Sequence, residues 1–326
     1  MKDQILTYLK EHQGFISGQD LCDELQVSRT AVWKVINQLK EAGYQIEAVR
    51  NKGYRLTEDA DILSQMELEG HFKAAGVLTP AVYCREVDST NHYARKLAEE
   101  GAVHGTVVVA ETQTAGKGRR GRGWVSPAGS AIYMSYILRP PIEPHQASAL
   151  TLVAAMAVQK AVSRMLPVEA RIKWPNDLII EGRKICGILT EMSSDMDGIR
   201  YVVTGIGINV NQLEFPEEIR ETATSLLAQT GQKLKRAALI AAIMNDFEHY
   251  YQSFITTADM SLLLDSYNQV LVNCMRTVAV IEPAGTWNGR ALGINARGEL
   301  MVEQEDGTVK NINSGEVSVR GVYGYV

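Results

Sequence analysis

The chain has 326 residues, of which 45% are hydrophobic and 22% are charged, and its formal net charge at pH 7 is −5. These values are ordinary for a soluble globular protein of two or three domains, and the negative charge argues against a protein that coats nucleic acid with its whole surface. The first residues do not have the apolar stretch of a signal peptide, and the longest nearly apolar run is too short to span a bilayer. We therefore expect a cytoplasmic protein with no membrane partner.

The N-terminal segment has the pattern of a winged helix-turn-helix. The first helix is expected within residues 2–12, the second follows the cap Ser17, and the third runs from the cap Ser28 to the stop Gly43. The stretches YQIEAV and YRL then flank the turn RNKG, which predicts a hairpin that serves as the wing. The inward positions of the three helices are Ile5, Leu6, Leu9, Leu21, Cys22, Leu25, Val32, Val35, Ile36 and Leu39.

The outward side of the third helix and the wing predict DNA binding. From Ser28 to Arg55, six basic residues stand against two acidic ones, a local net charge of +4. Such side chains suit phosphates and base edges in a major groove, although a small domain for protein contacts with a solvated basic face is the alternative. A single helix-turn-helix contacts only a few base pairs, so we expect a dimer that binds an operator with two half-sites. The candidate DNA-binding residues are Ser28, Arg29, Thr30, Trp33, Lys34, Asn37, Arg50 and Lys52.

The middle of the chain mixes strand and helix patterns, which predicts an α+β domain with a sheet flanked by helices. The polar stretch TEDADILSQ (57–65) is interpreted as its connection to the N-terminal head. Strands are expected at 81–87, 106–112, 131–138, 184–193 and 201–210, and helices at 89–101, 145–165 and 237–254.

Several common catalytic motifs are absent from the sequence. It contains no G-x-x-x-x-G-K-[ST], no G-x-S-x-G and no H-E-x-x-H, so P-loop NTPase, serine hydrolase and zincin chemistry lack their anchors. The segment GIGIN (205–209) is half of a dinucleotide fingerprint, but no helix pattern follows it, and a close-packed strand is the better interpretation. The widely separated cysteines favour neither a zinc site nor a disulfide framework, and we expect small buried hydrophobes at Cys22, Cys84, Cys186 and Cys274.

The segment TAGKGRRGRGW (114–124), here called the basic loop, alternates glycine with basic side chains and contains no acid. Backbone N–H groups of such a segment can curl around an anion, and arginine adds forked hydrogen bonds to carboxylate or phosphate. We interpret it as a phosphoryl-binding loop, with a solvated basic loop or a further nucleic-acid patch as the alternatives. Ordering so many glycines costs about 1–2 kcal/mol per residue in backbone entropy, which predicts a lid that stays mobile until a ligand binds.

Three further segments carry side chains suited to a binding pocket. KWPND (173–177) bends at Pro175, GRKICGIL (182–189) places Lys184 shortly before Gly187, and DSTN (88–91) supplies hydroxyls and an amide at a helix start. Each segment alone also has a plain structural explanation, with Trp174 in the core, Lys184 on the surface and DSTN as a helix cap.

Taken together, DSTN, ETQTAGKGRRGRGW (111–124), KWPND, KICGIL (184–189) and GIGINV (205–210) resemble the biotin protein ligases. With the N-terminal head, essentially the whole chain resembles the bifunctional ligases of the BirA type that also repress the biotin operon. Short strands from about Asn273 fit the SH3-like barrel that closes this family. The expected architecture is α+β and multidomain: a winged helix-turn-helix with linker (1–64), a mixed-sheet biotin/lipoate ligase-like catalytic domain (65–272) and an SH3-like β-barrel (273–326).

The resemblance implies a two-step reaction. Biotin's carboxylate attacks the α-phosphate of ATP to give biotinyl-5'-AMP and pyrophosphate, and biotin then passes to a lysine of a biotin carboxyl carrier protein. Positioning and charge neutralisation by the catalytic residues Arg119 and Lys184 and by Mg²⁺, whose ligands are unknown, would drive the first step. The adenylate is also expected to act as corepressor, because it orders the basic loop and favours a homodimer through that loop, 139–143 and 193–199.

Matching positions carry the implied site residues. Two departures are notable: Lys117 replaces an arginine that many relatives have, and no aromatic residue occurs between Phe215 and Phe247, which leaves the adenine contact open. A biotin or nucleotide sensor without ligase activity and a lipoate ligase are the alternatives. The implied biotin-binding residues are Ser89, Thr90, Asn91, Gln113, Gly116, Arg119, Arg120, Gly121, Trp124, Lys184 and Gly187. The implied nucleotide-binding residues are Lys117, Arg119, Arg122, Trp124, Asn176, Lys184 and Asn209.

Overall fold

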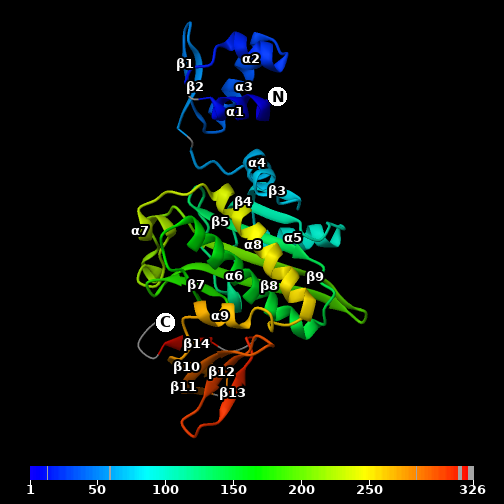
Figure 1. Ribbon diagram of the computed structural model, residues 1–326, viewed down its shortest axis with the longest axis vertical. Coiled ribbons are helices and arrows are strands. Elements are labelled where there is room, and N and C mark those ends of the chain that lie inside the picture. Colours follow the sequence, from blue (N-terminus) through cyan, green and yellow to red (C-terminus); the bar gives the residue numbers. More distant parts are fainter. Residues whose placement is uncertain (13, 59, 284, 315–317, 322–326) are drawn as a thin grey trace. The chain divides into compact units, whose positions relative to one another are not determined.

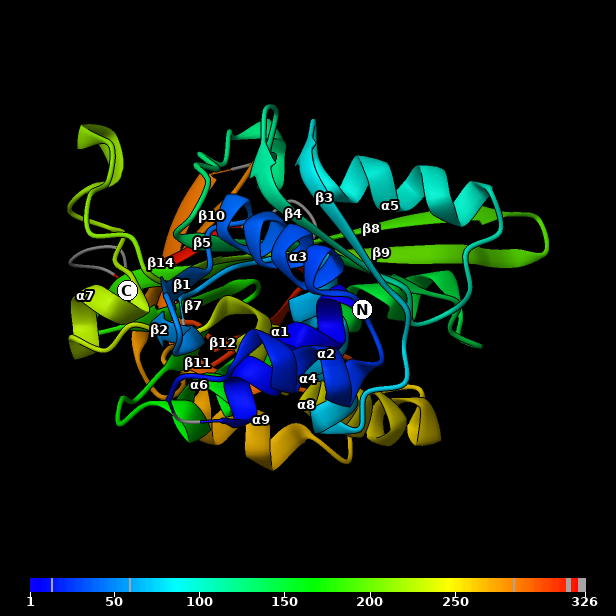
Figure 2. The same ribbon diagram turned by 90° about the horizontal axis from the view of Figure 1, so that it is seen from above.

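The computed structural model describes residues 1–12, 14–58, 60–283, 285–314 and 318–321. The chain divides into two compact units, 1–67 and 68–326. Figures 1 and 2 show the elements of each unit from two directions. In the described part of the chain, no helix combines the length and the apolar character that crossing a membrane requires.

The first unit is a helix-turn-helix followed by a hairpin, as predicted. Ser17 caps the second helix by accepting a hydrogen bond from Asp20 N, and Ser28 caps the third by accepting one from Ala31 N. These caps satisfy N–H groups that have no partner within a helix's first turn. The elements are α1 (Lys2–Glu11), α2 (Gly18–Leu25), α3 (Arg29–Glu41), β1 (Gln45–Val49) and β2 (Gly53–Glu58).

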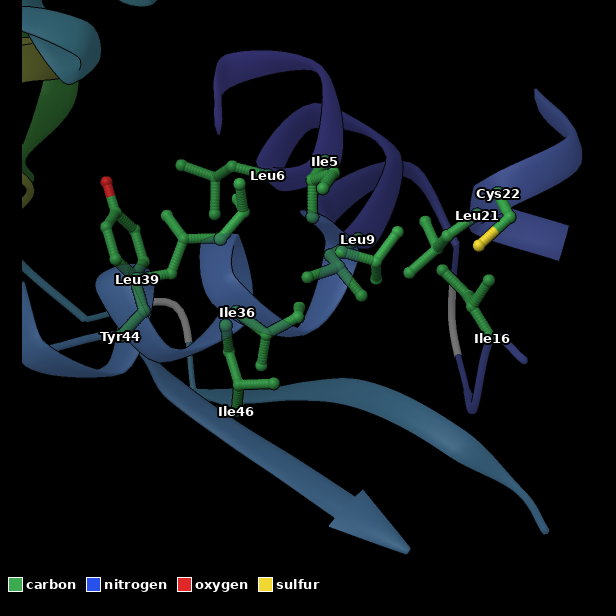
Figure 3. Close-up of a cluster of buried hydrophobic side chains, with 12 residues drawn as sticks. Ile5, Leu6, Leu9, Ile16, Leu21, Cys22, Ile36, Leu39, Tyr44 and Ile46 are labelled. Carbon is green, nitrogen blue, oxygen red and sulfur yellow. The ribbon is translucent and has the colours of Figure 1, made fainter. Parts of the chain in front are cut away.

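Apolar side chains of the three helices meet in one core, which Tyr44 and Ile46 extend toward the hairpin (Figure 3). Ile36, near the middle of α3, is 1% exposed. Burying such an aliphatic side chain stabilises a fold by about 1.5–3 kcal/mol. Of the inward positions predicted for the helices, Leu25 is half-buried and the others are buried.

The second unit is built on a seven-stranded mixed sheet with the strand order β3-β4-β5-β9-β8-β7-β6. Strands β3 and β4 are parallel, and the other neighbours are antiparallel. The interior strand β5 is buried along its whole length, as expected for a strand covered on both faces. The strands are β3 (Ala81–Val87), β4 (Val107–Gln113), β5 (Ala131–Leu138), β6 (Arg171–Lys173), β7 (Asp177–Ile180), β8 (Arg183–Asp195) and β9 (Gly198–Asn209).

Helices cover both faces of this sheet (Figure 2). Helix α5 packs on β4, β5 and β9 from one side, while α6 and α8 pack against each other on the opposite side. The segment 145–165, predicted as one helix, starts as a 3-10 helix (Pro144–Ala149) and becomes α-helical at Leu150. The helices are α4 (Gln65–Ala75), α5 (Thr90–Glu99), α6 (Leu150–Met165), α7 (Leu226–Thr230), α8 (Arg236–Thr257) and α9 (Leu264–Val270).

The C-terminal strands form an antiparallel sheet with the order β13-β12-β11-β10-β14. Within the described residues this sheet has two edges, β13 and β14, so the predicted strands are confirmed but the predicted closed barrel is not. Residues 315–317 and 322–326, around the last strand, lie outside the described residues. The strands are β10 (Thr277–Glu282), β11 (Gly285–Ile294), β12 (Leu300–Glu303), β13 (Val309–Ile312) and β14 (Ser318–Gly321).

The four cysteines are free thiols, in agreement with the sequence analysis. Cys22 and Cys186 are buried, whereas Cys84 and Cys274 are only half-buried. Burial raises the pKa of the Cys186 thiol, which keeps it protonated and unreactive at neutral pH.

Replacing Ile36 by alanine should lower the free energy of unfolding of the first unit by about 2–5 kcal/mol, because the deletion leaves a cavity in a fully buried core. Scanning calorimetry of the full chain should show that unit's transition lowered by roughly 10 °C or more. The control Gln38→Ala, on the exposed side of the same helix, should change stability by less than about 0.5 kcal/mol. Equal shifts for the two variants would contradict the assignment of this core.

Candidate active site

The basic loop joins β4 to β5 and folds back on itself. Gly118 N donates a hydrogen bond to Arg122 O over 2.7 Å, and Trp124 N donates one to Gly116 O over 2.9 Å. At the tip, Arg120 has a φ of 57°, a left-handed conformation that is uncommon outside glycine. The loop therefore carries its arginines at the tip and its tryptophan at the base.

Trp124 packs against two glycines of the sheet. Gly187 of β8 and Gly207 of β9 are register partners in the antiparallel pair. A Cβ at Gly207 would lie 2.8 Å from the indole, and one at Gly187 would lie 3.0 Å from it. A larger residue at either position would displace the ring, which confirms the prediction that the GIGIN segment is a close-packed strand.

A first cavity, of about 60 Å³, lies beside Trp124. One end of it is polar: the backbone N–H and the hydroxyl of Thr90 donate to Gln113 Oε1 over 2.9 and 3.1 Å, and Gln113 Nε2 donates to Ser126 Oγ over 3.0 Å. The cavity is lined by Ser89, Thr90, Asn91, Gln113, Lys117, Gly118, Arg119, Trp124, Tyr133, Asn176, Lys184, Gly187, Ile188, Leu189, Gly205, Ile206 and Gly207.

A second cavity, of about 430 Å³, adjoins the first. Part of its wall comes from the segment after β9, where Phe215, Pro216 and Ile219 supply apolar surface. The remaining lining residues are Gly118, Arg119, Arg120, Arg122, Gly123, Trp124, Val125, Pro127, Lys173, Asn176, Asp177, Lys184, Asn209, Gln212, Glu214, Glu218, Thr222 and Ala223.

The two cavities meet at a cluster of charged and polar side chains. Gly118, Arg119, Trp124, Asn176 and Lys184 line both cavities. Lys184 Nζ lies 2.6 Å from an oxygen of Asp177 and 5.3 Å from the centroid of the Trp124 ring. The junction therefore places two cations where two separate ligands would come together.

Arg119 is anchored from two directions. Its Nη1 donates to Asn176 Oδ1 over 3.1 Å, and its Nη2 donates to the backbone carbonyl of Ser314, next to the C-terminal sheet. Burial lowers the pKa of Arg119, and the negative charge of Asp177 works against that shift. The guanidinium stays charged, because arginine does not lose its proton in proteins.

The structure brings most of the predicted site residues to these cavities. Among the positions predicted for biotin, Gly116 packs against Gln113 and Trp124, Arg120 lines the second cavity, and Gly121 lines neither of the two. Among those predicted for the nucleotide, Lys117 lines the first cavity, and Asn209 lines the second while its amide donates to Thr224 O over 3.0 Å. The other predicted biotin positions line the first cavity: Ser89, Thr90, Asn91, Gln113, Arg119, Trp124, Lys184 and Gly187. The other predicted nucleotide positions line the second: Arg119, Arg122, Trp124, Asn176 and Lys184.

Four groups at the site were not predicted. Phe215 was named only as the residue after which no aromatic occurs until Phe247, and Asp177 was noted in KWPND without a partner. Ser126 and Ser135 belong to no local motif, and Ser135 contacts the site through residues far away in the chain, as in the bond of Ser135 Oγ to Thr90 Oγ1 over 2.8 Å. Among the described residues, no three His, Cys, Asp or Glu side chains are grouped so as to hold a metal ion.

The predicted DNA-binding residues lie on the outside of the first unit. Trp33 is 59% exposed, and Asn37 is half-buried. The guanidinium of Arg29 donates to Gln19 Oε1 over 2.8 and 3.2 Å, which joins the starts of α2 and α3. The remaining positions are exposed on α3 and the hairpin: Ser28, Thr30, Lys34, Arg50 and Lys52.

Comparison with known proteins places the chain in a family. Residues 83–209 match the biotin/lipoate A/B protein ligase family, residues 2–55 match an HTH domain, and residues 276–320 match the biotin protein ligase C-terminal domain. The biotin protein ligase from Aquifex aeolicus, solved in complex with biotin and ATP, superimposes with a TM-score of 0.66 at 31% identity and covers 74% of this chain and 99% of that one.

Two curated relatives cover nearly the whole chain. The bifunctional ligase/repressor BirA of Bacillus spizizenii is 42% identical over 322 residues, which cover 98% of this chain and 98% of that protein. The protein of the same name from Escherichia coli is 31% identical over 306 residues, which cover 94% of this chain and 93% of that protein. The chain therefore belongs to the BirA family of bifunctional ligase/repressor proteins.

Proposed function

We propose that the protein joins biotin to a lysine of a biotin carboxyl carrier protein at the expense of ATP, and that it represses biotin genes with biotinyl-5'-AMP as corepressor. The observation that carries the proposal is the meeting of two cavities at Arg119 and Lys184. A ligase that condenses a carboxylate with a phosphate needs two anionic ligands in contact, and cations at that point lower their repulsion.

Biotin is assigned to the first cavity. The polar end formed by Ser89, Thr90 and Gln113 suits the ureido ring, and Lys184 near the other cavity suits the carboxylate. This polarity also favours biotin over lipoate, whose dithiolane ring offers no N–H or C=O group. The cavity's volume of about 60 Å³ is below the usual range for ligand sites, so we infer that the basic loop and Trp124 shift as biotin binds.

ATP is assigned to the second cavity, whose volume of about 430 Å³ lies within that range. Phe215, Pro216 and Ile219 would supply the apolar surface for adenine, and Arg119, Arg122 and Lys184 would contact the phosphates. Mg²⁺ is usually held by one or two carboxylates together with substrate phosphates, and Asp177, Glu214 and Glu218 line the same cavity. When bound there, it would add positive charge beside the triphosphate.

The chemistry then follows from positioning. The biotin carboxylate attacks the α-phosphorus, the bond to the β-phosphate oxygen breaks, and pyrophosphate leaves with the negative charge. Lys184 and Arg119 stabilise the charge that builds on the phosphoryl oxygens, and Asn176 holds the guanidinium of Arg119 in place. In the second step the carrier lysine attacks the acyl carbon of the adenylate, and AMP leaves.

The first unit is assigned to operator DNA. A capped α3 with an exposed Trp33 and Lys34, followed by a hairpin that carries Arg50 and Lys52, matches a recognition helix with a wing. We assign residues 1–64 to this DNA-binding domain and its linker, 65–272 to the catalytic domain and 273–326 to an SH3-like barrel. ATP and DNA as partners also fit a cytoplasmic location.

Adenylate-dependent dimerisation would connect the two activities. Strand β3 is an edge of the seven-stranded sheet, and the hairpin between β8 and β9 exposes Met196 fully. The adenylate would order the basic loop, and the entropy lost in that step would no longer oppose the pairing of two protomers. A homodimer would then present two winged helix-turn-helix domains to an operator with two half-sites.

Lys184→Ala should lower kcat/KM for biotin transfer by about 100- to 1000-fold, because a cation that stabilises transition-state charge is lost. The measurement is ATP-dependent transfer of labelled biotin to a carboxyl carrier domain. The control is Arg183→Ala, because this neighbouring cation is not among the residues that line either cavity. Wild-type protein that binds biotin but transfers none would instead favour a sensor without ligase activity.

Lys52→Ala should weaken DNA binding to unrelated duplexes uniformly and reduce the slope of log K against log salt by about 1, because one phosphate contact is removed. Fluorescence anisotropy at several salt concentrations gives this slope. The control Lys73→Ala removes an exposed lysine of α4, outside the winged helix-turn-helix, and should leave the slope unchanged. If both variants gave the same slope, the wing would have no part in binding DNA.

Addition of biotin and ATP should convert the protein from monomer to dimer at a fixed micromolar concentration, because the adenylate orders the basic loop. Sedimentation velocity measures the change, and biotin without ATP is the control. A sedimentation coefficient that is the same with and without the adenylate would rule out this form of regulation.

A further inference from the structure

A chain of hydrogen bonds runs from the half-exposed Glu191 to the polar end of the first cavity. Asn91 Nδ2 donates to Glu191 Oε2 over 2.7 Å and to Leu189 O over 3.2 Å. Ser135 Oγ, which is fully buried, lies 2.7 Å from Asn91 Oδ1 and 2.8 Å from Thr90 Oγ1. We propose that Glu191, Asn91, Ser135 and Thr90, here called the relay, fix the direction of the hydrogen bonds that the cavity offers to its substrate.

The direction follows from the acceptors at the outer end of the relay. An ionised carboxylate and a backbone carbonyl can only accept, so the amide nitrogen of Asn91 faces Glu191 and Leu189 while its oxygen faces Ser135. Ser135 has one proton, which therefore goes to Asn91 Oδ1. Thr90 then directs its own proton to Ser135 Oγ or to Gln113 Oε1, which is 3.1 Å away. In both cases the hydroxyl of Thr90 presents only lone pairs to the cavity.

Gln113 is oriented from the other side. Its Oε1 accepts from Thr90 N over 2.9 Å, and its Nε2 donates to Ser126 Oγ, whose own proton goes to Trp124 O over 2.9 Å. Within the described residues, Nε2 makes one hydrogen bond, and we assign its second proton to the ligand. The same end of the cavity thus offers an acceptor at Thr90 and a donor at Gln113.

This pattern suits a cyclic urea, which has N–H donors beside a C=O acceptor. The inference rests on the proposed function, because biotin is the substrate whose ureido ring would match this donor and acceptor. Without an acceptor at position 91, Ser135 is able to donate to Thr90, and the Thr90 proton is then directed at the substrate's N–H. Asn91 and Glu191 are therefore positioning residues for biotin, and ATP does not depend on them.

Asn91→Asp tests the relay, because its carboxylate is repelled by Glu191 and by Leu189 O, so that the side chain turns away and no longer holds an acceptor against Ser135 Oγ. It should raise the Kd for biotin by about 10- to 100-fold and leave the KM for ATP within about twofold. Adding Glu191→Gln restores a donor opposite the new carboxylate and should return the Kd to within about fivefold of wild type. Glu191→Gln alone keeps an acceptor for Asn91 and should change the Kd by less than about threefold.

The measurements are calorimetric titration of the full chain with biotin, steady-state KM values for biotin and ATP, and melting temperatures. Should Asn91→Asp not fold, Glu191→Leu removes the carboxylate at a half-exposed position and should raise the Kd for biotin by about three- to tenfold. The control Arg95→Gln removes the exposed ion pair with Glu191, at 3.8 Å, and should bind biotin as wild type does.

Two failures are distinguishable. If Glu191→Gln does not rescue Asn91→Asp, or if the KM for ATP rises as much as the Kd for biotin, the relay is overturned while the ligase assignment stands. If the wild-type chain itself does not bind biotin, the proposed function is overturned, and the relay with it.

Discussion

The pairing of Gly187 with Gly207 across strands β8 and β9 is the constraint on which the site depends. Two facing positions without side chains leave a flat area of backbone, and Trp124 of the basic loop packs there. Gly205 lies two residues before Gly207 on β9 and therefore on the same face of the sheet. A Cβ at Gly205 would lie only 2.1 Å from Asn91 Oδ1, so this face also accommodates the side chain of Asn91 from helix α5. The backbone of the sheet thus forms the floor of the first cavity, and elements distant in the chain form its walls.

The position of Trp124 also bears on the proposed regulation. The residue is at the base of the loop whose tip carries the arginines, so a ligand that moves the indole changes the loop as a whole. Because four of the eight residues from Gly116 to Gly123 are glycines, ordering the loop costs backbone entropy, and its ordered state depends on the contacts that the loop makes. Under the proposed regulation, a ligand that orders the loop for chemistry orders it equally for contact with a second protomer.

Local signals were sufficient to predict most of the elements. Ser17 and Ser28 cap the helices that they were expected to cap, and the almost continuous apolar run 131–138 forms the buried strand β5, as predicted. The start of α6 differed from the predicted helix 145–165, because the residues Pro144–Ala149 adopt the tighter 3-10 geometry that is common in a helix's first turn. Closure of the C-terminal strands into a barrel depends on pairing between the two edge strands, β13 and β14, which periodicity does not report.

The site was predictable in its segments but not in its contacts. DSTN, the basic loop, KWPND and KICGIL all contribute to the two cavities, and their glycines and cations identified them. The pairing of Lys184 with Asp177 and the packing of Phe215 depend on a register between strands and on a loop path that no local pattern determines. Ser135 was missed for the same reason, since its strand reads as apolar core.

The bond from Arg119 to the carbonyl of Ser314 has a consequence for how such chains diversify. A segment that looks like a removable module supplies the backbone carbonyl that holds the guanidinium to which we assign a role in catalysis. Exchange of the C-terminal sheet between related enzymes would therefore change the position of Arg119. We expect the C-terminal sheet and the basic loop to evolve together.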